Sequence, residues 1–149
     1  MKTILTMIVA TLLCSCGPDM GEVRRYDYSV VNNSGVSVEV IPYSDGVVRI
    51  DKKVILNNAQ KINKIDIDYP PYGELRMINV LHPALRVNKI DIIFNSTKKI
   101  TYEDCSPANN CSEQLRNIFN GDFQNEQTEV YTITAEDFQN ATDCSGNCN

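Results

Sequence analysis

The chain has 149 residues, of which 42% are apolar and 22% charged, and its 14 Lys and Arg against 19 Asp and Glu leave a net charge of −5. This length suits one domain, and the apolar share is large enough for a core, which excludes a disordered or fibrous chain. An acidic balance without a basic run also argues against nucleic acid as a partner.

The N-terminus predicts an export signal. Lys2 supplies a positive charge, and residues 4–13 form an uncharged apolar run that is too short to span a bilayer. The next residues, Leu13-Cys14-Ser15-Cys16, resemble the bacterial lipobox, with an aliphatic residue at −3, small residues at −2 and −1, and a cysteine at +1. The resemblance implies cleavage after Ser15 and lipid attachment at Cys16.

A lipid on Cys16 would hold the protein on a membrane without spanning it. Each buried CH₂ contributes about 0.8 kcal/mol, so two or three acyl chains anchor almost permanently. Cys14 fits the pattern less well because Leu13 would stand at −1, and a plain signal peptide with two incidental cysteines is the alternative. Residues 16–25 contain Gly and Pro without periodicity, which predicts a tether.

The rest of the chain, residues 26–149, alternates apolar and polar side chains with period two, which predicts strands. Two such runs, 26–30 and 36–40, flank the turn signal Asn32-Asn33-Ser34-Gly35 and predict a β-hairpin. Further strands are expected over 47–50, 54–56, 62–69, 75–81, 87–94, 98–102 and 130–133. Short strands with turns about every ten residues predict an all-β domain, an antiparallel two-sheet sandwich with a short C-terminal tail.

Helical signals are few and lie near the C-terminus. Residues 113–120, preceded by the capping residue Ser112 and followed by Gly121, predict one short helix. Residues 134–138 have the pattern of a capping box that leads into a helical stub.

One loop and one histidine stand out between the predicted strands. In Tyr69-Pro70-Pro71-Tyr72 the prolines order a loop that presents two rings, so Tyr69 and Tyr72 are a candidate ligand surface. The alternative is a structural proline turn, and the absence of Trp weakens the case for a sugar platform. His82 precedes Pro83 and is expected to be a turn residue, since a lone imidazole cannot supply a multi-histidine metal site.

The motifs of enzymes are scarce. No nucleophile elbow, phosphate-binding glycine loop or calcium loop occurs, and we expect no cofactor and no metal. Asp66 and Asp68 share one face of a predicted strand, where they are either a solvated polar face or the carboxylates of a hydrolase. A non-enzymatic binding or structural module is the favoured interpretation, with an envelope hydrolase that uses surface carboxylates as the alternative.

Four cysteines remain after Cys14 and Cys16, and in an exported chain they predict two disulfides with three possible connectivities. Turn-forming residues separate Cys105 from Cys111 and Cys144 from Cys148, which favours pairing within each of these two pairs. A zinc site is less expected, because only the C-x₃-C spacing fits the usual C-x₂₋₄-C pairs, the other being C-x₅-C, and because thiols oxidise after export.

The lipobox, the strand of residues 26–33 and the segments 87–95 and 131–141 resemble the small uncharacterised outer-membrane lipoproteins of the Bacteroidetes type. The resemblance implies a lipid-anchored outer-membrane protein with an immunoglobulin-like fold and no catalytic residues. Its partners would be the membrane and an unknown envelope protein or glycan. Acidic residues after the lipidated cysteine favour surface display in that group, and Asp19 and Glu22 leave surface and periplasmic orientations open.

Overall fold

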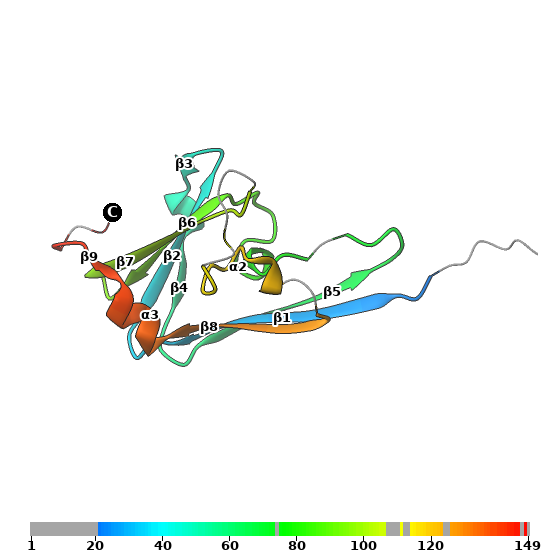
Figure 1. Ribbon diagram of the computed structural model, residues 1–149, viewed down its shortest axis with the longest axis horizontal. Coiled ribbons are helices and arrows are strands. Elements are labelled where there is room, and N and C mark those ends of the chain that lie inside the picture. Colours follow the sequence, from blue (N-terminus) through cyan, green and yellow to red (C-terminus); the bar gives the residue numbers. More distant parts are fainter. Residues whose placement is uncertain are drawn as a thin grey trace, which may run out of the picture.

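The strands form two sheets, and the protein is the expected all-β two-sheet sandwich (Figure 1). The computed structural model describes residues 21–73, 75–106, 111, 114–123, 126–146 and 148. The strands are β1 (Arg24–Asn33), β2 (Val38–Ser44), β3 (Val47–Val48), β4 (Val54–Leu56), β5 (Lys61–Asp68), β6 (Lys89–Phe94), β7 (Lys98–Glu103), β8 (Thr128–Thr134) and β9 (Thr142–Asp143). The helical turns are η2 (Ile50–Lys52), α2 (Ile78–Leu81), η3 (Gly121–Phe123) and α3 (Ala135–Asn140).

One sheet has three strands in the order β5-β1-β8, and the other has the order β3-β2-β6-β7-β9 with β4 also paired to β2. Figure 1 shows β1 and β5 running out past the six-stranded sheet on the right of the view, whereas β3 and β9 lie on the left. The core lies between the sheets, where alternate residues of each strand point inward. Its largest fully buried side chains include Tyr28, Val30, Val38, Ile90, Phe94, Tyr131 and Ile133.

The predicted hairpin between the first two strands is wrong, because β1 and β2 belong to different sheets. The side chain of Asn32, fully buried, donates to the carbonyls of Val36 and Leu56 at 2.8 Å each. Its Oδ1 accepts from the backbone N–H and the hydroxyl of Ser34 at 3.0 and 2.7 Å. These bonds satisfy the backbone of a bend, so the chain crosses to the other sheet without losing hydrogen bonds.

The strand pairing departs from a purely antiparallel sandwich at one place. β8 runs parallel to β1, with Val30 opposite Tyr131, whereas the other pairs between described strands are antiparallel. A parallel neighbour needs a long crossover, and here the whole segment between β1 and β8, which contains β2 to β7, provides it.

Two expected elements are wrong and one is confirmed. Residues 75–81, predicted as a strand, contain the short helix α2 instead. Their apolar side chains at 75, 77, 78, 80 and 81 are all buried, and a short apolar run can be buried as a strand or as a helix. Residues 114–120 form successive turns with Asn117 N–H bonded to the Gln114 carbonyl, not a helix; Ser112, its expected cap, lies outside the described residues. The capping box holds: the Thr134 hydroxyl accepts from the Asp137 N–H at the start of α3, and Asp137 accepts from the Thr134 N–H.

Candidate functional site

The loop of residues 69–72, which carries the first candidate surface, contacts the start of the domain through Tyr72. The Tyr72 hydroxyl donates to the Glu22 carbonyl, and the Arg24 guanidinium lies 3.8 Å from the centre of the Tyr72 ring. β1 begins at Arg24, so the described part of the expected tether, residues 21–25, packs against the domain; residues 16–20, with Cys16, lie outside the described residues. Tyr69 is 64% exposed, whereas Tyr72 is half-buried, so the two rings lie in different surroundings.

The paired carboxylates of β5 both have local partners, and only Asp68 contacts the loop of residues 69–73. Asp68 accepts from the N–H of Tyr69 at 2.9 Å and from that of Gly73 at 2.7 Å. Asp66 accepts from the N–H of Ile67 at 3.2 Å and lies 3.6 Å from the Lys64 ammonium. Both carboxylates line a small pocket of about 180 Å³, where local donors already engage them. This arrangement gives the hydrolase alternative no specific support.

His82 lies at the start of a turn, as expected, where its backbone carbonyl accepts from the N–H of Leu85 at 3.3 Å, and its side chain is buried. Its side chain is 5% exposed, and among the described residues its Nε2 has no hydrogen-bond partner. Burial lowers the pKa of this imidazole from 6.5 to about 4, so the ring is neutral at neutral pH. A buried, neutral and single histidine has a packing role here.

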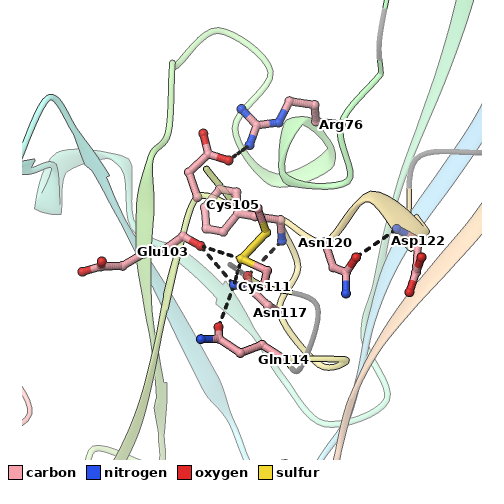
Figure 2. Close-up of a disulfide and its surroundings, with 10 residues drawn as sticks. Arg76, Glu103, Cys105, Cys111, Gln114, Asn117, Asn120 and Asp122 are labelled. Atoms are coloured by element: carbon pink, nitrogen blue, oxygen red, sulfur yellow. Dashed lines mark hydrogen bonds and ion pairs between the residues drawn. A yellow bond between two sulfur atoms is a disulfide. The ribbon is translucent and has the colours of Figure 1, made fainter. Parts of the chain in front are cut away.

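Both predicted disulfides are present with the expected local pairing: Cys105 bonds to Cys111 and Cys144 to Cys148, with Cα atoms 5.4 and 5.0 Å apart. Figure 2 shows the first bond beside Asn117, whose amide donates to the Glu103 carbonyl at 3.0 Å. The hydrogen bond from Asn117 holds the turns after Cys111 against the end of β7.

The second disulfide covers a different surface, the face of the six-stranded sheet that points away from the core. The register places Ile41 opposite Asp91 and Ile93 opposite Lys99 on this outer face. Ile41, Ile93 and Cys148 are 3%, 1% and 7% exposed and form a second buried cluster, with Cys144 packed against it. The tail therefore gives the outer face a small core of its own.

Beside this cluster lies a pocket of about 290 Å³, here called the outer pocket. Its lining residues come from four strands, the turn η2 and the tail: Ile41, Tyr43, Val48, Ile50, Asp91, Lys99 and Cys148. Val48 and Ile50 are 47% and 53% exposed and form an apolar rim. Concave sites with apolar walls and a few convergent polar groups are typical of small-ligand binding.

The polar floor of the outer pocket is centred on Asp91, which is 4% exposed. Its Oδ1 accepts from the Thr101 hydroxyl at 2.6 Å, and its Oδ2 accepts from the Tyr43 hydroxyl at 2.9 Å and the Lys99 ammonium at 3.5 Å. Burial and the hydrogen bond to Asp91 raise the pKa of Tyr43. Tyr43 therefore stays protonated at neutral pH and keeps donating to the carboxylate.

A second pocket of about 480 Å³ is also lined by Tyr43, together with Lys89 and Glu103. Lys89 lies 5.1 Å from the ring centre and pairs with Glu103 at 3.4 Å. The side chains of Lys89 and Glu103 are 35% and 57% exposed, and solvent therefore weakens their ion pair. The outer pocket, with its buried carboxylate, is the better candidate site.

Sequence reasoning missed the outer pocket, although one signal was available. Asp91 interrupts the most apolar strand of the chain between Ile90 and Ile92, and a carboxylate there must find partners if it is to be buried. The partners Tyr43, Lys99 and Thr101 come from two neighbouring strands, so only the register reveals them.

No cluster of three potential ligands for a metal ion occurs within the described residues, and none of the helices described there is long and apolar enough to cross a membrane. The chain matches no model of a protein family, no curated protein and no solved structure in the comparisons made with it. The function must therefore be argued from the chain's own residues.

Proposed function

We propose that the protein is a bacterial lipoprotein, anchored in the outer membrane through lipid on Cys16, whose exported β-sandwich is a non-enzymatic binding module of the cell envelope. The observation that carries the export part is the pair of local disulfides, since such bonds persist in oxidising compartments. Together with the lipobox ahead of them, they support a chain that leaves the cytoplasm and stays on a membrane.

The geometry of the domain supports a binding role. β1 enters at the end of the three-stranded sheet, whereas β3 and β9 lie at the opposite end of the molecule (Figure 1). The outer pocket is lined by residues of β2, β3, η2, β6, β7 and the tail after β9, so it lies apart from the start of β1, where the anchored segment would join the domain. A pocket held away from the membrane is accessible to ligands in the surrounding medium.

The test is metabolic labelling of the full chain with an alkyne fatty acid in a bacterial host, followed by membrane fractionation. Cys16→Ala should lose the label and leave the membrane fraction, because it removes the thiol at position +1 of the lipobox. Cys14→Ala is the matched control and should label like the wild type. Equal labelling of Cys16→Ala and wild type would overturn the anchor.

A further inference from the structure

The outer pocket is lined by a hydrogen-bond acceptor, Asp91, and a hydrogen-bond donor, Lys99, that lie next to each other. A carboxylate has about four acceptor sites, and Asp91 uses three of them for Thr101, Tyr43 and Lys99. An ammonium group has three donors, and among the described residues Lys99 has one hydrogen-bond acceptor, Asp91. One acceptor site of Asp91 and two donors of Lys99 therefore remain, and both side chains line the pocket.

The charges of this floor select against ionic ligands. Asp91 and Lys99 lie 3.5 Å apart and nearly cancel each other. An anion that approaches Lys99 comes close to the Asp91 carboxylate, and a cation that approaches Asp91 comes close to the Lys99 ammonium. Repulsion over such distances is costly beside a carboxylate that is only 4% exposed. A neutral ligand with an adjacent donor and acceptor meets both groups without this penalty.

We propose that the outer pocket binds one neutral sugar ring through a pair of vicinal hydroxyls, one donating to Asp91 and its neighbour accepting from Lys99. A hydroxyl is both donor and acceptor, so two adjacent hydroxyls match the free capacity of the floor. The ring's C–H surface lies against Ile41, Val48 and Ile50. A volume of about 290 Å³ corresponds to on the order of ten water molecules, which suits a single ring.

The proposal rests on the proposed binding role and names its ligand class. The test uses the protein purified from cells in a detergent without a sugar headgroup, ¹⁵N-labelled and titrated with methyl glucoside, methyl mannoside and methyl galactoside. At least one glycoside should shift the amide signals of Asp91, Lys99 and Thr101 at millimolar concentration. Trans-1,2-cyclohexanediol should shift the same signals, whereas cyclohexanol, with one hydroxyl, should bind at least severalfold more weakly.

Two variants test the roles of the floor and the rim. Lys99→Met should weaken glycoside binding about tenfold or more, the loss expected for one hydrogen bond from a charged group. Lys53→Met is the matched control, because Lys53 pairs with Glu39 of β2 at 2.8 Å but does not line the pocket. Ile50→Arg, at a position 53% exposed, should fold normally and block the pocket.

Three results would overturn the sugar assignment: no shift with any glycoside or diol, equal binding by Lys99→Met and Lys53→Met, or tighter binding of glucuronate or glucosamine than of the neutral glycosides. Each would leave the labelling at Cys16 unaffected. The failure of the ligand class is therefore distinguishable from failure of the anchor.

Discussion

The outer faces of the two sheets carry similar isoleucines with opposite surroundings. On the six-stranded sheet Ile93 is 1% exposed and Ile41 3%, whereas on the three-stranded sheet Ile65 is 48% exposed and Ile67 55%. The difference is the tail: β9 pairs with β7, and the disulfide that follows it places Cys148 on Ile41 and Ile93. Within the described residues nothing comparable crosses the outer face of β5.

This comparison shows that strand alternation alone does not decide which apolar face is buried. A covered outer face gains packing, a buried carboxylate and a pocket, whereas an uncovered face keeps its isoleucines in water. A covered outer face can support ligand binding, because hydrogen bonds to a buried group such as Asp91 are stronger where water is excluded.

The largest effect should separate the two faces directly. Ile93→Ala should lower the free energy of unfolding by about 2–4 kcal/mol, because it opens a cavity under the tail. Ile65→Ala, at a half-exposed position, should change it by about 0.5 kcal/mol or less. Urea unfolding of the two variants measures both values, and equal losses would contradict the claim that only one outer face is covered.

A second prediction concerns the pH dependence of stability that the buried His82 causes, away from both outer faces. Between pH 6.5 and about 4 the unfolded chain protonates His82 while the folded protein keeps it neutral, so stability falls as the pH falls. The loss should reach up to about 3 kcal/mol near pH 4. His82→Leu should lack this part of the pH dependence in urea unfolding. The same decrease in His82→Leu and wild type would show that another group causes it.

Third, loss of the disulfide in the tail should expose the outer face of the six-stranded sheet, as the outer face of β5 is exposed already. The double variant Cys144→Ser/Cys148→Ser should lose about 2 kcal/mol from loop entropy alone, and uncovering Ile41 and Ile93 adds to this. It should also bind a hydrophobic dye more strongly.

The control for the cover is Cys105→Ser/Cys111→Ser, which loses a similar entropy but leaves the tail in place. Its dye binding should stay close to that of the wild type. A dye signal that rises equally in both double variants would contradict the specific covering role of the tail.

The smallest expected effect concerns the base of the tail. Arg116 pairs with Asp137 at 2.6 Å and thereby ties the turns after Cys111 to α3, which leads into β9. Burial alone would raise the pKa of Asp137, but Arg116 and the Thr134 N–H outweigh it and lower the pKa. Arg116→Gln should therefore lower the free energy of unfolding by about 1 kcal/mol at neutral pH, a modest value because Arg116 is partly hydrated.

The sign of the pH effect follows from the lowered pKa. The stabilisation by Asp137 is complete above the pKa of about 3.8 in the unfolded chain and disappears as the pH falls through the lowered folded value. Wild type and Arg116→Gln should therefore converge in stability at acid pH, as followed by thermal unfolding. A difference that stays constant to pH 2 would contradict an electrostatic origin.

Local features of this protein were determined by the sequence alone. The buried faces of β1, β2 and β6 follow from period-two alternation, and the turn at 95–97 joins β6 to β7 as expected. The capping box at Thr134 and the pairing of each cysteine with its near neighbour also involve residues only a few positions apart. Such contacts form with little loop entropy, so short sequence patterns are sufficient to specify them.

Other features were decided only by the tertiary structure, because they join segments far apart in the chain. β1 and β2 separate into two sheets at the bend held by Asn32, and β8 returns to lie parallel to β1. The outward direction of Ile65 depends on which face of β1 packs on the other sheet, and the pocket around Asp91 depends on the register of β2, β6 and β7. Strand register and sheet membership are set by the packing of the whole core, which no single segment encodes.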